Sequence, residues 1–405
     1  MSVDNYVTRV IEDPAGIAQD HWDSLLTACN QHGQSANGTL NPFVRHAYLA
    51  AMHSSASAVT QTGWQAYFVS LWDTSQAQEQ LVGVCPMYIK AHSYGEYVFD
   101  FAWARAYQEH GLAYYPKAVI APPFTPVPGP RLIAATQANK TALLAATLAT
   151  CKDLGVSSMH ALFIDDSDRE ACQAHGLLMR QTVQFHWHNT TPGYASFDAF
   201  LTTMTQDKRK KIKQERRKVA DAGVRFESKR GLAITEQDWA LFYRCYEQTY
   251  VEHGNAPYLT PAFFEAMRDH MPENWVMFVA YTDTDQAFAC SLVGLEVDGH
   301  GQAVAAFGRY WGALARVDCL HFEACYYQPL MWCIENGVQR FEGGAQGEHK
   351  MARALMPQTT YSAHWLAHPS FADAVDRYLE RETQGMQAYV QDLQARNPFK
   401  ASQPL

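Results

Sequence analysis

The sequence lacks the features that would place it in a membrane or on a secretory pathway. No run approaches the roughly 18 consecutive apolar residues that a membrane-spanning helix needs. Residues 1–16 carry charges throughout and have no apolar core, so we expect no secretory signal. With 47% hydrophobic and 13% aromatic residues, the composition is that of an ordinary globular protein. We therefore expect a soluble cytoplasmic protein with no transmembrane segment.

The chain also lacks the patterns of disulfide frameworks and metal sites. Its nine cysteines are odd in number and form no Cys-x-x-Cys pair, so we expect free thiols in a reducing compartment. His186 and His188 share one face of a predicted strand, but no third ligand accompanies them at a convincing spacing, and we predict no metal site. A Gly-x-Ser-x-Gly elbow and a Cys–His nucleophile pair are absent too. Any group transfer is then expected to be direct, without a covalent enzyme intermediate.

Positive charge is concentrated in one segment. The chain has a net charge of −9, with 32 lysines and arginines against 41 aspartates and glutamates. Residues 207–218 hold eight basic and two acidic side chains, a local charge of +6, so the rest of the chain carries −15. Ile212 and Val219 form one narrow apolar stripe and Gly223 follows as a C-cap, which predicts a helix over 206–223. Its basic face is either a solvated surface or a contact for phosphates of tRNA or CoA, or for anionic lipid headgroups.

One order of elements occurs in both halves of the chain: a helix, a strand, further strands, a second helix and a last strand. In the first half these elements are predicted over 42–52, 64–72, 81–103, 141–155 and 159–165. In the second half they are predicted over 261–271, 274–282, 288–312, 320–337 and 338–344. This order predicts an α/β (α+β) fold with mixed, mostly antiparallel sheets flanked by helices. We place two tandem domains at 1–190 and 191–405, the second with the basic linking helix and a C-terminal helix over 371–396.

Several motifs in this pattern resemble those of one protein family. They are NPFVRHAYL, HSYGEYVFDFAWARAY, YYPK, PFTPV, GPRL, KRKKIKQERRKV, GRYWG, LHFEACYYQ and FEGGAQGEHK. Over about residues 40–380 the chain resembles the Fem-like predicted N-acyltransferases, also labelled peptidoglycan biosynthesis/recognition proteins, of the Gcn5-related acyltransferase (GNAT) superfamily. The resemblance implies two tandem GNAT-like domains, in agreement with the repeated order of elements.

One GNAT feature is missing from the chain. Ordinary GNAT enzymes hold the pyrophosphate of acetyl-CoA in a Gln/Arg-x-x-Gly-x-Gly/Ala turn before a helix, and no such turn precedes 141–155 or 320–337. Either the donor phosphates are bound differently, or the donor is not CoA. Since the better-known Fem-like transferases use aminoacyl-tRNA, acyl-CoA and aminoacyl-tRNA are the two donor hypotheses, each as a co-substrate and with no tightly bound cofactor. The donor-phosphate candidates are Lys208, Arg209, Lys210, Lys211 and Arg217.

Two strand patterns provide candidates for substrate binding. In the first, the core face is expected to consist of Tyr97, Phe99, Phe101 and Trp103. Tyr94, Glu96 and Asp100 form the opposite face, which either lines a pocket or is a solvent-facing strand edge. In the second, Gly308 marks a bulge or relieves packing. The resemblance implies that Gly308–Trp311 border the reaction centre, where Arg309 is placed to hold a carboxylate or phosphate.

Candidate catalytic residues follow from the needs of N-acylation, which are a base for the amine proton and donors for the developing oxyanion. A glycine-rich segment follows the strand at 338–344, and strand ends of α/β sheets tend to bind ligands. Its polar side chains are Glu342, Gln346, Glu348, His349 and Lys350. The candidate bases are Glu342 and His349, Tyr310 is a candidate proton donor to the leaving group, and the rivals for these roles are His321 and Glu323. Gln346 is a substrate-binding candidate, and surface salt bridges are the alternative for Glu348 and Lys350.

Three functions remain open from the sequence. The first is an N-acyltransferase that moves an acyl or aminoacyl group from a phosphate-bearing donor to a small-molecule or lipid amine. The second is a non-catalytic protein that recognises a cell-wall precursor. The third is transfer from a long-chain acyl-CoA to a sphingoid-type amine. The corresponding partners are the amine acceptor, tRNA and, by peripheral contact, a membrane surface.

Overall fold

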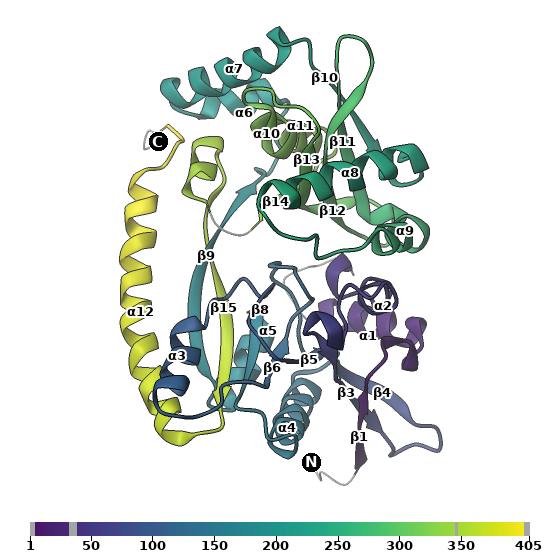
Figure 1. The fold of residues 1–405 in the computed structure, drawn as a ribbon, viewed down its shortest axis with the longest axis vertical. Coiled ribbons are helices and arrows are strands. Elements are labelled where there is room, and N and C mark those ends of the chain that lie inside the picture. The colour runs from purple at the N-terminus through teal and green to yellow at the C-terminus, as the bar shows by residue number, and fades with distance from the viewer. Residues whose placement is uncertain (1–4, 32–38, 345–346, 401–405) are drawn as a thin grey trace. The chain divides into compact units, whose positions relative to one another are not determined.

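The structure of the chain is a computed structural model that describes residues 5–31, 39–344 and 347–400. It divides into two compact units: unit 1 consists of Met1–Thr182 and Thr359–Ala388, and unit 2 of Val183–Gln358 and Tyr389–Leu405. The chain passes between the units along strands β9 (Leu178–His188) and β15 (Met356–Leu366) and along helix α12 (Pro369–Ala395). Both units mix helices and strands, so the predicted α/β class is confirmed (Figure 1).

Unit 1 contains two groups of strands. The first is an antiparallel sheet of order β1 (Tyr6–Ile11), β3 (Phe68–Asp73), β4 (Gln80–Cys85) and β7 (Ile133–Ala134). The second has the order β15, β8 (Ser158–Ile164), β6 (Lys117–Ile120), β5 (Met87–Lys90) and β2 (Gln65–Ala66). In this second group β6 and β8 run parallel, whereas the other pairs are antiparallel.

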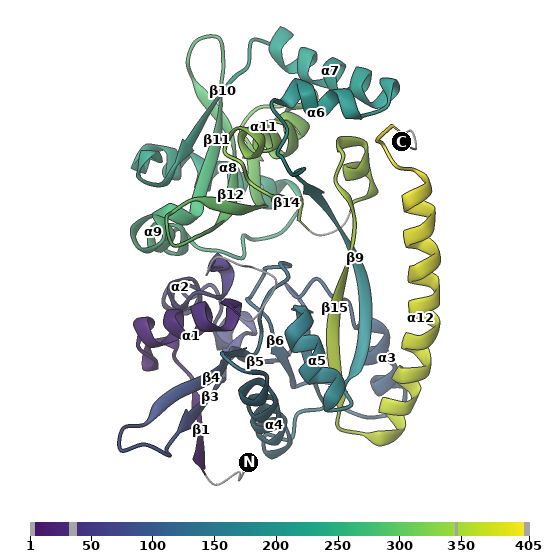
Figure 2. The same cartoon turned by 180° about the vertical axis from the view of Figure 1, so that it is seen from behind.

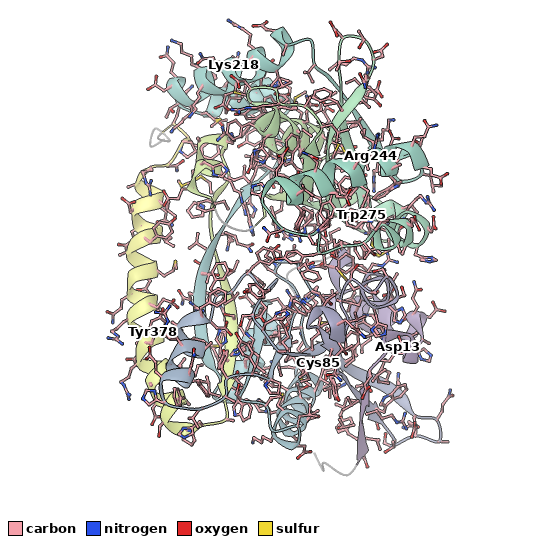
Figure 3. All side chains as sticks on the ribbon, viewed as in Figure 1. Asp13, Cys85, Lys218, Arg244, Trp275 and Tyr378 are labelled. Carbon is pink, nitrogen blue, oxygen red and sulfur yellow. The ribbon has the colours of Figure 1, made fainter. Side chains whose placement is uncertain are left out.

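Helices cover these strands and enclose the core of unit 1. They are α1 (Gln19–Gln31), α2 (His46–Ser54), α3 (Phe101–Glu109), α4 (Gln137–Asp153), α5 (Asp166–Ala174) and the first part of α12. In the core, Val69 and Cys85 of the first sheet pack with Leu143 of α4 and with Met159 of β8. Figure 2 shows α4 and α5 as neighbours, and Figure 3 labels Cys85. The helix predicted over 141–155 is α4, and its buried residues, Lys140, Leu143, Leu144, Thr147 and Cys151, lie at helical spacing on one face.

Unit 2 has a single run of strands with helices packed on it. The strand order is β10 (Arg225–Arg230), β11 (Trp275–Tyr281), β12 (Ala287–Val297), β13 (Ala303–Ala313), β14 (Arg340–Glu342) and β9. All pairs are antiparallel except β13 and β14, which run parallel. The helices are α6 (Phe197–Thr203), α7 (Gln206–Asp221), α8 (Glu236–Glu252), α9 (Pro261–His270), α10 (Leu320–Phe322) and α11 (Gln328–Glu335). A π-helical segment, η7 (Glu323–Tyr327), joins α10 to α11.

Several predicted elements of unit 2 are confirmed. The hairpin predicted over 288–312 consists of β12 and β13, and Asp298 accepts the backbone hydrogen bonds that close its turn. The basic helix is α7, in which Ile212 and Val219 are each 2% exposed and the following Gly223 has a φ of 73°. The helix predicted over 371–396 is α12, whose first part belongs to unit 1. Among the described residues, every helix is too short or too polar to span a lipid bilayer.

The strand predicted to continue through residue 103 is wrong. Strand β5 ends at Lys90, and α3 begins at Phe101, so the alternation read over Tyr94–Trp103 does not exist. Phe101 is 49% exposed instead of buried, and Tyr97 has a φ of 65°, which no strand residue adopts. The cause is electrostatic, because the buried ammonium of Lys117 draws the acidic side chains of this segment inward.

Each unit contains one parallel strand pair, and in unit 1 a loop covers the strand edge beside that pair. The parallel pairs are β6 with β8 in unit 1 and β13 with β14 in unit 2, and in each pair the two strands are connected through a helix. The two domains predicted over 1–190 and 191–405 stay a prediction. In unit 1 the proline-rich loop 121–132 follows β6, and its Gly129 forms a parallel bridge with Ile164 of β8. Arg131 of this loop is fully buried and donates to the backbone carbonyl of Leu162 at 2.8 Å. The loop therefore occupies the edge of β8 beyond the end of β6.

Asp168 holds this loop in place and provides a test of the packing. Its buried carboxylate accepts hydrogen bonds from the backbone N–H groups of Arg131 and Leu132 and pairs with Lys140 at 2.6 Å. We expect Asp168→Ala to lower the free energy of unfolding by about 3–5 kcal/mol, because it leaves a buried ammonium and two N–H groups without partners. The exposed Asp166→Ala should cost about 0–1 kcal/mol. Equal unfolding midpoints of the two variants in urea would contradict this account.

Candidate active site

A β-bulge interrupts β13 at Arg309. Along the hairpin, Leu292 pairs with Tyr310 while the next residue, Val293, pairs with Gly308, so Arg309 is the extra residue of the bulge. A Cβ at Gly308 would lie 3.2 Å from the ring of Phe341, a tight contact that glycine relieves. The bulge predicted from Gly308 is confirmed, and the packing alternative also applies to the same glycine.

The parallel pairing between β13 and β14 stops at this bulge. Its last residue pair is Phe307 with Glu342, after which β13 continues to Ala313 while β14 ends. The chain leaving β14 turns at Gly343 and Gly344, and Gly344 has a φ of 79°. The two strands therefore separate in the middle of unit 2.

A cavity of about 470 Å³ lies where the strands separate, and we call it the strand cavity. Residues from α8, β12, β13, the α10–η7 segment and the end of β14 line it. Its aromatic side chains are Tyr246, Tyr250, Tyr310, Trp311 and Tyr326. Arg309 and two histidines, His253 and His321, also line it, whereas no carboxylate does among the described residues. The cavity lining is thus largely aromatic and carries a positive charge.

Tyr310 is the best-placed proton donor of this cavity. It is 9% exposed, and its ring packs edge-on against Phe242, Tyr246 and Phe264, with ring centroids 5.5–6.2 Å apart. Its hydroxyl makes no hydrogen bond with any described residue. The hydroxyl is itself buried from solvent, so a residue that lines the cavity carries a buried polar atom without a partner.

His321 is the candidate base that lines the same cavity as Tyr310. Its ring packs edge-on against Trp311 at 5.4 Å and Tyr326 at 5.7 Å. Burial lowers the pKa of His321 to about 4, and the positive charges of Arg353 and Lys350 act in the same direction. The imidazole is consequently neutral at pH 7, and the same low pKa makes it a weak proton acceptor unless a bound ligand raises it.

The other sequence candidates of this region lie outside the cavity lining. Glu342 is buried, pairs with Arg340 at 2.9 Å and has His186 at 3.8 Å. His349 has its Nε2 3.3 Å from the hydroxyl of Tyr326, so it contacts a lining residue without lining the cavity itself. Glu323 turns toward α7, where it accepts from Arg216.

The glycine-rich segment after β14 has structural contacts for two of its polar residues. Glu348 is exposed, accepts from the hydroxyl of Tyr389 at 2.8 Å and pairs with Arg396 at 2.9 Å, which fits the salt-bridge alternative. Lys350 is buried and donates to the carbonyl of Gly344 at 3.0 Å, so it holds the turn that follows β14. Gln346 lies outside the described residues.

The substrate-binding candidates of the first half belong to unit 1. Tyr94 is 65% exposed, while Glu96 and Asp100 are buried against Lys117. Lys117 also donates to Ser93, and Asp100 accepts from the hydroxyl of Tyr114 at 2.6 Å. Burial raises the pKa of Glu96 to about 7. These two carboxylates are part of a buried polar network, so the alternative of a solvent-facing strand edge is wrong for them.

The basic residues of α7 are available for ligands. Lys210, Lys211 and Arg217 are exposed, and Lys208 and Arg209 are half-buried. Within the described ranges, none of these five side chains forms an ion pair. Arg217 also lines a cavity that α7 forms with β10 and η7.

Sequence reasoning missed the contribution of α8 to the strand cavity. Tyr246 and Tyr250 are four residues apart and therefore lie on one helix face, a signal that the sequence did contain. It also missed the buried network of Lys117, His160 and His364, in which the two histidine Nδ1 atoms are 2.8 Å apart. No local pattern links these residues, because they come from three separate strands.

Glu342 provides a pH test of the geometry at the end of β14. Burial raises its pKa to about 7, against about 4.3 in an unfolded chain. Its contribution to stability is therefore fully present below about pH 4 and is lost as the pH rises through 7. We expect the stability of Glu342→Gln relative to wild type to rise between pH 4.5 and pH 8 by about 3 kcal/mol, measured by urea denaturation. A pH-independent difference would show that this carboxyl is not desolvated.

Comparison with known proteins places the chain in a family. No curated protein matches its sequence. Similar solved structures include L-PGS from Bacillus licheniformis, at 8% identity and a TM-score of 0.48, covering 82% of this chain and 96% of that one. The C-terminal domain of a putative lysylphosphatidylglycerol synthetase from Agrobacterium fabrum has 9% identity and a TM-score of 0.48, covering 88% and 96%. Saccharomyces cerevisiae N-myristoyltransferase with bound myristoyl-CoA has 10% identity and a TM-score of 0.44, covering 90% and 79%.

A family model described as peptidoglycan biosynthesis/recognition matches residues 14–401, so the chain belongs to the FemAB-like family.

Proposed function

We propose that unit 2 is an N-acyltransferase that moves an acyl group from an activated, phosphate-bearing donor to an amine in the strand cavity. The observation that carries this proposal is the separation of β13 from β14 at the Arg309 bulge, which opens the cavity of about 470 Å³. A parallel pair that stops inside a sheet leaves room for an extended ligand beside a strand. The family membership of the chain is consistent with such a role.

The chemistry needs one bond to form and one to break. The amine nitrogen attacks the carbonyl carbon of the donor, and the bond from that carbon to the leaving sulfur or oxygen breaks. The proton lost by the amine must leave the nitrogen, and the leaving group must gain a proton. His321, as a neutral imidazole, accepts the first proton, and the hydroxyl of Tyr310 donates to the leaving group. Both side chains line the same cavity, as this division of roles requires.

The lining of the strand cavity favours an acyl group without a positive charge. An aminoacyl group carries an ammonium, which in a buried site is normally paired with a carboxylate. The described lining contains Arg309 and histidines but no aspartate or glutamate. The aromatic walls instead suit a hydrocarbon chain. Among the two donor hypotheses, this composition supports acyl-CoA over aminoacyl-tRNA, while both the acceptor amine and the acyl length stay open.

Tyr310→Phe tests the proposal because it removes one hydroxyl and keeps the packed ring. The purified protein is first incubated with acyl-CoAs of several lengths, aminoacyl-tRNA and a pool of small and lipid amines, and acylated products are identified by mass spectrometry. We expect Tyr310→Phe to lower the initial rate by about a hundredfold, as the loss of a proton donor does, with an unchanged melting temperature. Tyr243→Phe, on α8 but outside the cavity lining, is the matched control and should keep the wild-type rate.

Two outcomes would overturn the proposal. If wild type acylates no amine from any donor, the alternative of a non-catalytic recognition protein gains support. If Tyr310→Phe and Tyr243→Phe are equally active, the strand cavity is not where the leaving group is protonated.

A further inference from the structure

We propose that α7, β10 and η7 form a phosphate subsite for the donor, in a second cavity of about 310 Å³ that we call the basic cavity. It is lined by Lys213, Arg216, Arg217, Val219, Ala220, Val224, Phe226, Glu323 and Gln328. The ligand chemistry is a diphosphate or phosphodiester, as CoA and tRNA both carry. The inference rests on the proposed function, since it names the binding site for the phosphates of the same donor.

The charge of the basic cavity suits a dianion. Lys213 and Arg217 are four residues apart on α7, so they extend from the same helix face, and both are exposed. Neither forms an ion pair with a described residue. With Arg216 they bring three positive charges to the lining, against the single carboxylate of Glu323. The surplus positive charge lies where a ligand can reach it, in a chain whose net charge is −9.

Arg216 and Glu323 form the rigid wall of this cavity. The guanidinium Nε and Nη2 of Arg216 lie 3.2 Å from the carboxylate oxygens of Glu323, and Gln328 donates to the same carboxylate at 2.7 Å. The guanidinium also lies over the ring of Phe197, 5.1 Å from its centroid. Because these contacts hold the side chains in place before a ligand arrives, less conformational entropy is lost on binding.

Residues of the segment η7 line both the basic cavity and the strand cavity. Glu323 begins this five-residue π-helix and lines the basic cavity, whereas Cys325 and Tyr326 of the same segment line the strand cavity. One short segment thus contributes residues to both cavities. Single π-helical turns of this kind often occur at functional sites. A donor with its phosphates at α7 and its acyl group beside β13 would contact both sides of η7.

The basic cavity would replace the glycine-rich pyrophosphate turn that the sequence lacks. No glycine-rich pyrophosphate turn precedes the helix that begins at Leu320, and the residue before that helix, Cys319, has a φ of 66°. Backbone N–H groups of such a turn would otherwise neutralise the donor phosphates. Side-chain cations from a neighbouring helix can perform the same task, because charge-assisted hydrogen bonds to phosphate are strong.

The test uses inorganic pyrophosphate as the probe, with binding to the full chain measured by isothermal titration calorimetry. We expect Lys213→Ala and Arg217→Ala each to weaken pyrophosphate binding about tenfold, the usual effect of losing one hydrogen bond to a charged group. Lys218→Ala is the matched control. It removes the same charge from the same helix, and Lys218, labelled in Figure 3, does not line the cavity. We do not substitute Arg216, because that would leave the buried Glu323 unpaired and destabilise the fold.

Three results would decide the matter. Weaker binding for the two cavity variants and not for Lys218→Ala supports the subsite. Equal weakening in all three variants would reduce α7 to a diffuse positive surface and overturn it, as would the absence of pyrophosphate binding to wild type. A second set of titrations with CoA and with deacylated tRNA identifies the source of the phosphate: the ligand whose affinity depends on Lys213 and Arg217 and not on Lys218 is the one held in the cavity.

Failure of the subsite and failure of the proposed function give different results. Tyr310→Phe should bind pyrophosphate as wild type does, because Tyr310 lines the strand cavity only. If pyrophosphate binds as expected but no amine is acylated, the transferase proposal alone is lost. If acylation occurs and Lys213→Ala has no effect on donor affinity, the subsite alone is lost.

Discussion

The parallel ladder between β13 and β14 ends where Gly308 and Arg309 interrupt β13, and the rest of the candidate site depends on this ending. The bulge places one extra residue in β13 and leaves its pairing with β12 intact on both sides. β13 therefore stays in the sheet while it separates from β14, and Gly343 and Gly344 turn the other strand away. Because the sheet remains anchored through the long β12–β13 hairpin, the opening costs only a few hydrogen bonds of a short strand. Tyr310, Trp311 and His321 then have a space to line.

The two units differ in what lies beside their parallel strand pair, which is a loop in unit 1 and a cavity in unit 2. In unit 1 the loop 121–132 continues along β8 through the Gly129 bridge, with Arg131 and Asp168 bonded to the backbone beneath it. In unit 2 a cavity lies beside the corresponding parallel pair. A buried charged network suits the first role, since it specifies one loop conformation at the cost of desolvation. This contrast is why we place the proposed chemistry in unit 2 alone.

Much of the fold could be predicted from the sequence, and much of the site could not. The hairpin around Asp298, the basic helix with Ile212 and Val219 inward, and the bulge at Gly308 all follow from local patterns of turn residues, apolar spacing and glycine. The alternation read across residues 94–103 was wrong, because an attraction to Lys117, some twenty residues away in the sequence, outweighed the local preference for a strand. Tyr246 and Tyr250 lay on a predictable helix face, but nothing in that helix indicated which strand it would meet.

Local patterns of residues are enough to predict the periodicities, the position of the bulge and the concentration of positive charge in one helix, because each of these depends on residues close together in the chain. Packing between segments pairs Glu342 with Arg340 at the end of β14, brings His321 and Tyr310 to one cavity, and turns Glu323 toward Arg216. A carboxylate or imidazole takes its role from its burial and its neighbours, and those neighbours are supplied by segments far away in the sequence. The basic helix illustrates both parts: its charge was evident from the residues, but the cavity beside Lys213 and Arg217 exists only because η7 and β10 pack against it.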